Sequence, residues 1–370
     1  MSDSLDAAAA AIAERLLDGE KVVLTQIHGG GNNRVYRLAR TGAAEALALK
    51  LYAPPGTASE DAIARLRREF DGLQFLCAHG FTSVPKAIAV MHDALAALYE
   101  WVDGSKPALL EPENRQANDI GAAISFVRDL HRLSRQPGTT FGDTAREACL
   151  SGAELLRQVE KRVEALSGIT AAADLQDFIA GTFRPALDLA ARRLADWAAV
   201  SGTALPDDLA PTRRLLSPSD FGFHNTLRRA NGQLVFIDFE YFGWDDPVKL
   251  LADFVWHPAM QLSASECAAF LGENLTLLAA DDPALPGRFN AQFPLYGLRW
   301  AAILLNEFFP ERWQRRVFAG KDAANAEAWA AAKARQLCRA RQYLQIVQAA
   351  SKTAAHAPIA VLLEIMVPNQ

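Results

Sequence analysis

The stretch SPSDFGFHNTLRRANGQLVFIDFE, residues 217–240, decides how the rest of this chain is interpreted. Two short runs within it, residues 226–229 and 234–237, flank the dipeptide Asn231-Gly232. Asn-Gly between two such runs is typical of a tight β-hairpin, because both residues tolerate a left-handed backbone. The stretch therefore predicts one hairpin, with a polar residue directly before its first strand and another directly after its second strand.

The open end of this hairpin carries the residues with chemical potential. If the two runs pair, Asn225 and Asp238 emerge side by side, and together they offer an amide oxygen and a carboxylate. Such hard oxygen ligands suit Mg²⁺, which uses one or two protein side chains and leaves its other positions to water and phosphates. Asp220 lies five residues before Asn225. The catalytic loop of protein kinases has the same D-x-x-x-x-N spacing, in which Asp accepts the substrate hydroxyl proton and Asn binds magnesium.

The letters D-F-G at Asp220-Phe221-Gly222 suggest a different assignment. In protein kinases a DFG aspartate holds magnesium. Here the tripeptide precedes the hairpin, whereas Asp238 follows it. Spacing therefore predicts Asp238 and Asn225 as the metal ligands, and Asp220 as the base.

The first hundred residues favour a sheet. Five runs have β character, and one segment between them has the helical period, with Ile63, Leu66, Phe70, Leu73 and Leu76 on one stripe. The expected strands are residues 21–27, 34–38, 46–52, 86–90 and 95–101, and the expected helix is residues 59–79. These elements predict a five-stranded antiparallel sheet with one helix, preceded by an Ala-rich helix that ends at Gly19.

A glycine run, Gly29-Gly30-Gly31, separates the first two expected strands. A Rossmann or Walker phosphate loop needs a helix after its glycines, and the following RVYRLAR does not supply one. The run is therefore a turn between strands.

The remainder of the chain is mostly helical. Residues 118–133, 150–165 and 175–201 have helical periodicity, as do several segments after Pro247, and the hairpin is the expected exception. The segment from Val102 to Pro107 is loop-like and is a candidate hinge. We expect an α+β chain with an N-terminal lobe over residues 1–103 and a helical C-terminal lobe over residues 104–370.

Bulk properties exclude several functions. The chain has 370 residues, enough for two lobes, and a net charge of −5 without clusters of Lys or Arg, so we expect neither nucleic acid nor a membrane as partner. Its four cysteines are far apart, which argues against a zinc site or a disulfide framework and fits a reducing cytoplasm. No targeting segment and no apolar run of about 18 residues is evident.

Taken together, these motifs resemble the aminoglycoside phosphotransferase and choline kinase group of kinase-like enzymes. Their catalytic segment commonly reads HGDLHPGN, where this chain has SPSDFGFHN, and their metal segment reads IDFEDAGWGDP, where this chain has IDFEYFGWDDP. Their GGxSNxxYR pattern is similar to GGGNNRVYR at residues 29–37. The resemblance covers roughly residues 20–255 and implies a two-lobed, protein-kinase-like fold.

The resemblance also implies roles for single residues. Lys50 would contact the α- and β-phosphates of ATP and pair with Glu69, and Asp220, Asn225 and Asp238 would keep the roles given above. The loop Gly29, Gly30, Gly31, Asn32 and Asn33 would cover the phosphates, and the backbone of Glu100, Trp101 and Val102 would receive adenine. The expected cofactors are ATP and Mg²⁺, and the expected acceptor is a hydroxyl of a small soluble molecule.

Each role has an alternative. Lys50 could be a charge that protects an edge strand, and Glu69 could pair with Arg65 on its own helix. His224, Glu240, Asn306 and Glu307 are weaker candidates for substrate contact. His224 and Glu240 could instead support the metal site, and the last two could instead satisfy a buried hydrogen bond.

Departures from the group raise a second hypothesis, although the base and the metal ligands are all retained and an active enzyme stays the leading one. Pro218 and Gly222 replace the two catalytic-loop histidines, His224 replaces a glycine, and Leu250 stands at an aspartate position, with Asp253 one turn later. These changes are compatible with a pseudokinase-like protein that binds nucleotide without transfer. A protein kinase is disfavoured, because no activation segment ending in A-P-E follows Asp238. The acceptor (sugar, amino alcohol or aminoglycoside), ATP against GTP, and the oligomeric state stay open.

Overall fold

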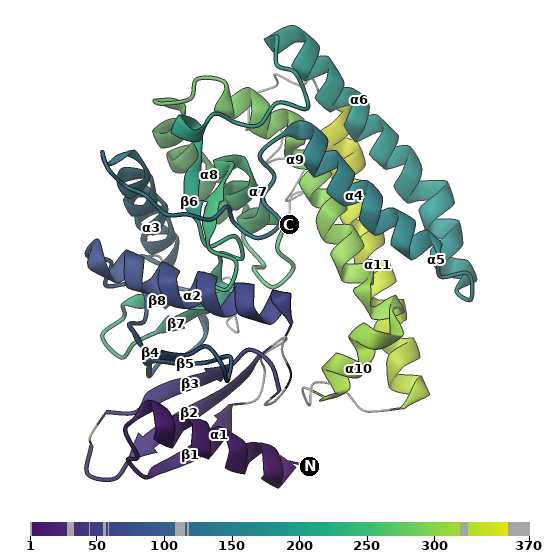
Figure 1. The fold of residues 1–370 in the computed structure, drawn as a ribbon. Helices are drawn as coiled ribbons and strands as arrows, with labels where there is room; N and C mark the ends of the chain where they lie inside the picture. Colours follow the sequence, from purple (N-terminus) through teal and green to yellow (C-terminus); the bar gives the residue numbers. More distant parts are fainter. Residues whose placement is uncertain are drawn as a thin grey trace.

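The computed structural model describes residues 2–27, 33–43, 45–54, 57, 59–107, 115–116, 118–318 and 325–353. The chain first forms a five-stranded antiparallel sheet in the order β1-β2-β3-β5-β4 (Figure 1). We call this region, from α1 to β5, the sheet part. Its elements are α1 (Ser2–Leu16), β1 (Val22–Ile27), β2 (Arg34–Arg40), β3 (Leu47–Leu51), α2 (Glu60–Ala78), β4 (Ala87–Met91) and β5 (Ala96–Glu100).

A helix covers each face of this sheet (Figure 1). Ala9, Ile12 and Ala13 of α1 share a buried cluster with Leu49 and other residues of one sheet face. Leu66, Phe70, Leu73 and Leu76 of α2 belong to the main core on the other face. Because side chains alternate along a strand, Lys50 in the central strand β3 points to the α2 face while its leucine neighbours face α1. The sheet predicted from the sequence is confirmed.

The buried stripe of α2 differs from the expected one at its start. Ser59 caps the helix by accepting a hydrogen bond from the N–H of Ala62 at 3.1 Å, and the stripe from Leu66 onward is buried as expected. Ile63 was expected to be buried and is 49% exposed, so that expectation was wrong. The first turn buries Ala62 and Arg65 instead, because Arg65 has charged partners inside the protein.

The rest of the chain, from α3 onward, is mostly helical, and we call it the helical part. Its helices are α3 (Asn118–Arg135), α4 (Gly152–Ser167), α5 (Ala173–Phe178), η3 (Ile179–Phe183), α6 (Arg184–Ser201), η4 (Pro211–Arg213), η5 (Phe223–Asn225), α7 (Pro247–Trp256), α8 (Ala264–Ala279), α9 (Leu285–Leu304), η6 (Leu305–Phe308), α10 (Pro310–Phe318) and α11 (Ala326–Lys352). Helix α9 is almost wholly buried and packs against α4, α6, α7 and α11 (Figure 1).

One long predicted helix is interrupted. The sequence predicts helix throughout residues 175–201, but Ile179–Phe183 forms a wider π turn in which the N–H of Arg184 donates to the carbonyl of Ile179. Pro185 follows at once and has no N–H to donate, so the regular ladder is broken there.

Two short ladders surround the residues quoted at the outset. The predicted hairpin is present as β7 (Thr226–Arg228) paired with β8 (Leu234–Phe236). A second ladder, β6 (Leu215–Ser217) with β9 (Gly243–Asp245), was not predicted, since the hairpin was expected to be the one exception to helix. Its strands are far apart in sequence and only three residues long, so neither carries a usable alternation.

The predicted hinge is attached to the hairpin. The N–H of Ser105 donates to the carbonyl of Arg228 at 3.0 Å, and the N–H of Arg228 donates back at 2.8 Å. A Cβ on Gly104 would lie 2.5 Å from the Arg228 oxygen, so only glycine allows this approach. The connection between the two parts of the chain is therefore tied to the hairpin that carries the candidate site.

Within the described residues, no helix combines the length and the apolarity needed to cross a lipid bilayer.

Replacing Gly243 tests the unpredicted ladder. A Cβ on Gly243 would lie 2.5 Å from two backbone atoms of residues 144 and 145, which cannot move aside like a side chain. We expect Gly243→Ala to lower the free energy of unfolding by roughly 1–3 kcal/mol, measured by urea denaturation. Gly272→Ala is the matched control, because a Cβ there meets no described atom within 4 Å, and should be neutral or slightly stabilising. An unchanged Gly243→Ala midpoint would contradict the close approach.

Candidate active site

A buried lysine, Lys249, anchors the loop that carries Asp220. Ser219 has a left-handed backbone, with φ of 68°, and its hydroxyl accepts a hydrogen bond from Lys249 Nζ at 2.5 Å. Lys249 lies on α7 between the carboxylates of Asp245 (3.6 Å) and Asp253 (3.1 Å). A network within the helical part therefore sets the position of the residue before Asp220.

The Asp220 carboxylate has three nitrogen neighbours. His224 Nε2 lies 2.9 Å from Oδ1, Asn225 Nδ2 donates to Oδ2 at 3.1 Å, and His257 Nε2 lies 4.0 Å from Oδ1. Burial opposes ionisation, but His224, His257 and Asn225 together hold the pKa of Asp220 well below its ordinary value. The side chain is 34% exposed, so an ionised carboxylate faces open space.

The hairpin brings Asn225 and Asp238 together at its open end. The N–H of Ile237 donates to the carbonyl of Asn225 at 2.9 Å, which extends the β7–β8 ladder by one rung and places Asp238 next to it. Asp238 has φ of 69°, a left-handed backbone that Asp adopts more readily than most residues. Its side chain is 37% exposed. The Asn225 amide nitrogen donates to the Asp220 carbonyl and carboxylate, which directs the amide oxygen away from Asp220.

Lys50 connects the sheet part to this hairpin. Its Nζ lies 2.6 Å from Glu69 Oε2 on α2 and 2.6 Å from Asp238 Oδ1. The lysine side chain is 9% exposed and the glutamate 5% exposed. Tyr52 donates to the same Glu69 oxygen at 2.6 Å, and its hydroxyl lies 2.7 Å from that of Tyr99. Glu69 thus pairs with Lys50. Arg65, the alternative partner of Glu69 on the same helix, pairs with other residues.

Charge and burial compete in this group. Burial alone would lower the pKa of Lys50, but Asp238, Glu69 and Glu240 outweigh it and raise that pKa well above its ordinary value. Burial raises the pKa of Glu69 to about 7 against the opposing charge of Lys50. The lysine is therefore a fixed cation, and burial makes the Glu69 and Asp238 carboxylates beside it easier to protonate than usual, because it raises the pKa of each.

A second buried cation, Arg65, was not singled out in the sequence. Its guanidinium contacts Glu240 at 3.1 Å, Asp61 at 3.1 Å and the Asn33 side-chain oxygen. Asn33 Nδ2 donates to Glu240 Oε2 at 2.5 Å. Glu240 therefore ties the end of the glycine-rich segment to α2, and its carboxylate lies close to those of Glu69 and Asp238, all within 4.8 Å of one another.

Two predicted nucleotide segments are only partly described. Gly29, Gly30, Gly31 and Asn32 lie outside the described residues. In the segment from Glu100 to Val102, the Glu100 side chain pairs with Arg229 at 2.5 Å. Trp101 Nε1 donates to Asp103 at 2.6 Å, and Val102 is buried.

The late-helix candidates lie on η6. Asn306 is partly exposed, and Glu307 is buried, with its backbone carbonyl accepting a hydrogen bond from Trp329 Nε1 at 2.7 Å. This turn directly follows α9, whose Trp300 packs its edge against the His257 ring with centroids 4.5 Å apart. Their predicted contact with substrate stays a prediction.

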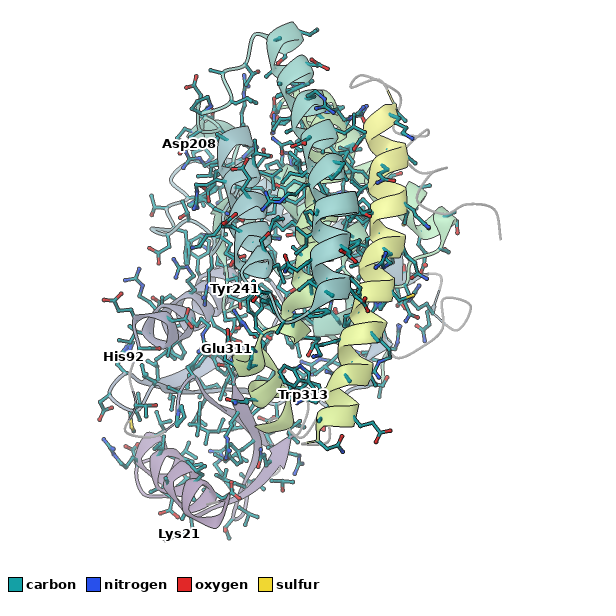
Figure 2. The ribbon with its side chains drawn as sticks, turned by 90° about the vertical axis from the view of Figure 1, so that its right-hand side faces the viewer. Lys21, His92, Asp208, Tyr241, Glu311 and Trp313 are labelled. Atoms are coloured by element: carbon teal, nitrogen blue, oxygen red, sulfur yellow. The ribbon has the colours of Figure 1, made fainter. Side chains whose placement is uncertain are left out.

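Sequence reasoning missed His257, Lys249, Arg65 and Tyr241. Tyr241 lies at the level where the sheet part meets the helices (Figure 2), and the Arg146 guanidinium is 5.2 Å from its ring centroid. Its place beside Glu240 in the metal segment was a usable signal. His257 carried none, because it ends a helix far along the chain from Asp220.

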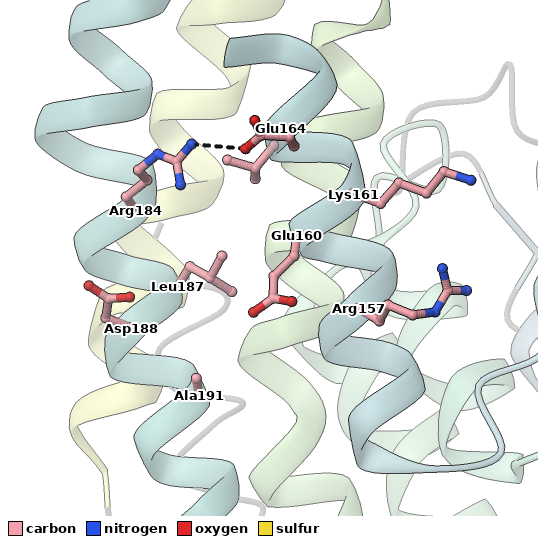
Figure 3. Close-up of a pocket in the computed structure, with 9 residues that line it drawn as sticks. Arg157, Glu160, Lys161, Glu164, Arg184, Leu187, Asp188 and Ala191 are labelled. Atoms are coloured by element: carbon pink, nitrogen blue, oxygen red, sulfur yellow. Dashed lines mark hydrogen bonds and ion pairs between the residues drawn. The ribbon is translucent and has the colours of Figure 1, made fainter. Parts of the chain in front are cut away.

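A separate surface pocket lies between α4 and α6 (Figure 3). Its lining is dominated by charged side chains, and Arg184 pairs with Glu164 at 3.5 Å. The residues that line it are Arg157, Glu160, Lys161, Val163, Glu164, Arg184, Leu187, Asp188 and Ala191. None of the predicted site residues that the structure describes lines this pocket, so it is not part of the candidate active site.

A strand lysine paired with a helix glutamate and with an aspartate of the hairpin is the arrangement that the resemblance to kinase-like enzymes implies. The sequence pattern of the phosphotransferase enzyme family (APH) matches residues 23–274, and the chain belongs to this family. The predicted resemblance is thus confirmed. No sequence of a curated protein matches the chain.

Solved structures share the whole fold at low identity. Choline kinase LicA from Streptococcus pneumoniae has 13% identity and a TM-score of 0.53, over 90% of this chain and 97% of that chain. The gentamicin-APH(2")-IIa complex has 13% identity and a TM-score of 0.55, over 97% and 98%. ADP-bound aminoglycoside phosphotransferase APH(2'')-Ib has 11% identity and a TM-score of 0.53, over 97% and 99%. The predicted two-lobed, kinase-like fold is confirmed.

Removing Lys50 tests the buried charge group. Lys50→Met leaves the Glu69 and Asp238 carboxylates without their shared cation, and breaking a buried pair typically costs roughly 3–5 kcal/mol of unfolding free energy. The pKa of Glu69 is raised in the folded protein, so protonated Glu69 stabilises the fold. This contribution to the free energy of unfolding is complete below about pH 4.5 and is lost as pH rises through about 7. The variant raises that pKa further, and its defect should be larger at about pH 8 than at about pH 5.

The measurement is urea denaturation at both pH values with a chelator present. Lys21→Met is the matched control, because this lysine side chain is 81% exposed in its pair with Glu14 and should matter by less than about 1 kcal/mol at either pH. An equal loss of unfolding free energy at both pH values in Lys50→Met would contradict the pairing of Lys50 with Glu69.

Proposed function

We propose that this protein is an ATP- and Mg²⁺-dependent phosphotransferase that transfers the γ-phosphate to a hydroxyl of a small molecule. One observation carries the proposal: Lys50 of the sheet part lies 2.6 Å from Asp238, whose hairpin also carries Asn225 and the Asp220 loop. A cation for phosphates, oxygens for a metal ion and a carboxylate for a hydroxyl therefore lie in one place. The family membership and an ADP-bound structural neighbour support the nucleotide.

The two parts of the chain would divide the work. We assign residues 1–103 to the nucleotide, with Gly29–Asn33 over the phosphates and the backbone of residues 100–102 at adenine. Residues 104–370 would hold the catalytic loop, the metal ligands and the acceptor. The attachment of Ser105 to Arg228 supports this division, because it joins the boundary between the parts to the catalytic hairpin.

The residues present fit a magnesium ion. Asp238 offers a partly exposed carboxylate, and the amide nitrogen of Asn225 is engaged by Asp220, which leaves the amide oxygen as its ligand atom. Both are hard oxygen donors, as Mg²⁺ requires. Bound magnesium would offset the negative charge of the nucleotide phosphates.

The chain's own residues then perform the positioning. Lys50 would hold the α- and β-phosphates, and Glu69 keeps that ammonium in place. Asp220 would orient the acceptor hydroxyl and take its proton. The lowered pKa makes Asp220 a weak base, which suffices because phosphoryl transfer depends mainly on positioning and charge stabilisation.

The acceptor belongs to the class of small soluble alcohols. The structural neighbours include a choline kinase and a gentamicin complex, so amino alcohols, sugars and aminoglycosides form the library to test. Asn306 and Glu307 on η6 are the proposed acceptor contacts, and we place the protein in the cytoplasm on the basis of its unpaired cysteines.

Replacing the base and the metal ligand tests the proposal. Asp220→Asn and Asp238→Ala should each lower kcat by about 10²–10⁴-fold, because proton transfer and metal binding would be lost. The assay is Mg²⁺-dependent formation of ADP and phosphorylated product across the alcohol library. Asp93→Asn is the control, since that carboxylate is 69% exposed in a surface pair with Arg15 and should leave turnover unchanged.

Full turnover in both variants would overturn the assignment. Binding of Mg-ATP without transfer to any acceptor would instead favour a nucleotide-binding protein that does not catalyse.

Asn225 should affect the metal requirement specifically. Asn225→Ala removes the amide ligand, so the Mg²⁺ concentration for half-maximal activity should rise about tenfold or more, equivalent to about 1.4 kcal/mol. Asn231→Ala alters the turn of the same hairpin, where its side chain accepts from the Gln233 N–H at 3.0 Å, and should leave the Mg²⁺ requirement unchanged. Equal Mg²⁺ dependence in the two variants would argue against ligation by Asn225.

A further inference from the structure

Gly222 and the His224 ring occupy one space. Gly222 has φ of 164° and ψ of 179°, an extended backbone open to any residue, so the glycine is not needed for its conformation. A Cβ there would lie 2.8 Å from His224 Nδ1, 2.9 Å from His224 Cε1 and 2.6 Å from Met260 Sδ. Position 222 therefore has no room for a side chain, because Met260 Sδ and the imidazole of His224 both pack against its backbone.

The surroundings of His224 also define its tautomer. Its Nδ1 is buried and has no hydrogen-bond partner within the described part of the chain. A proton on Nδ1 would be a buried, unpaired N–H, which is costly. The proton of the neutral ring is therefore on Nε2, which lies 2.9 Å from Asp220 Oδ1 and donates to it.

His257 stacks on a face of the His224 ring. The two imidazoles stack with centroids 3.6 Å apart and an interplanar angle of 6°. The His257 Nδ1 accepts from the Ala259 N–H at 3.2 Å, and Trp300 on α9 packs edge-on against the His257 ring. His224 is thus held by contact with the Gly222 backbone and by stacking on a histidine that itself packs against Trp300 of α9; we call these contacts the clamp.

This arrangement differs from a metal site. Asp220, His224 and His257 offer ligand atoms within 4.8 Å of one another. However, the lone pairs of two parallel, stacked imidazoles run in separate planes and cannot both point at one ion. The Nε2 proton of His224 is already used for Asp220. The group is therefore suited to hydrogen bonding and orientation.

We propose that His224, held by Gly222 and His257, is the positioning residue that orients the Asp220 carboxylate toward the acceptor hydroxyl. The proposal rests on the function proposed above. It also accounts for a departure in the sequence: relative to HGDLHPGN, this chain has glycine at 222 and histidine at 224, an exchange of the two residue types. An imidazole is therefore still present. It belongs to His224, two residues after position 222, and it lies against the Gly222 backbone.

A double-mutant cycle of Gly222 and His224 tests the clamp. His224→Ala should lower kcat about 10–100-fold, with the KM for ATP within about twofold, because only the orientation of Asp220 changes. His224→Gln should recover most of the loss, since its amide can donate to the carboxylate. Gly222→Ala should lower kcat about tenfold by displacing the ring, and most of that loss should be absent in the His224→Ala background, where only Met260 is still displaced.

Two outcomes would overturn the proposal. Multiplicative losses in the double variant would mean that Gly222 acts independently of the His224 ring. An unchanged kcat with a raised KM for the acceptor in His224→Ala would mean that His224 contacts substrate. His257→Phe keeps a flat ring in the stack, so it should retain most activity, whereas His257→Ala should behave like Gly222→Ala.

A readout without turnover separates this inference from the proposed function. In protein labelled with ¹⁵N-histidine, the signal that disappears in His224→Ala belongs to this ring. It should show protonated Nε2 and unprotonated Nδ1, and should shift in Asp220→Asn and in Gly222→Ala. If these shifts occur but no acceptor is phosphorylated, the clamp stands and the proposed function fails. If transfer occurs and neither variant moves the signal, the clamp is wrong.

Discussion

The buried ammonium of Lys50 is the interaction on which the arrangement of this molecule depends. It sits between a glutamate from α2 and an aspartate from the catalytic hairpin, at 2.6 Å from each. A lysine with so little solvent access needs carboxylates to offset its desolvation, and these two come from opposite sides of the site. The sheet, its covering helix and the hairpin must therefore meet at this point. Arg65 forms a similar buried ion pair beside Lys50. It lies on α2 and contacts Glu240 and Asn33.

Asp220, the proposed base, is held in a comparable way by the helical part. Lys249 of α7 reaches Ser219 from inside, between the carboxylates of Asp245 and Asp253. Arg299 and Trp300 of α9 contact the same Asp253, and Trp300 continues to His257. Two central helices thus reach the loop of Asp220, α7 through the hydroxyl of Ser219 and α9 through Trp300 and His257. The proposed base has a fixed orientation because its neighbours are packed within the core.

Much of this site was predictable from short-range patterns. The alternation in residues 46–52 placed Lys50 opposite the leucines of its strand, and the Asn-Gly turn placed Asn225 beside Asp238. Both predictions needed only local geometry, since side chains alternate along a strand and a hairpin brings its two ends together. The spacing of Asp220 to Asn225, and not the letters D-F-G, placed Asp220 beside Asn225, and Asp238 after the second strand of the hairpin, as in the structure, while their roles as base and metal ligand stay predictions.

Other features depended on partners far along the chain. The exposure of Ile63 and the burial of Arg65 follow from Glu240, which lies on a different segment and makes the inward position of an arginine favourable. The ladder of β6 with β9 joins strands too short to show a period, and the π turn before Pro185 depends on a single missing N–H.

The sequence by itself determined the main order of sheet and helices, the family, and the candidate residues for phosphate, metal and hydroxyl, because these are properties of residue type and local spacing. Only the tertiary structure decided what surrounds them. Glycine is required at position 222 because Met260 and the His224 ring lie against its backbone. The His224 ring is in turn stacked on His257, which ends a helix in another part of the chain. Stacking and buried hydrogen bonds act over a few ångströms, so residues distant in sequence must be brought together before either can form.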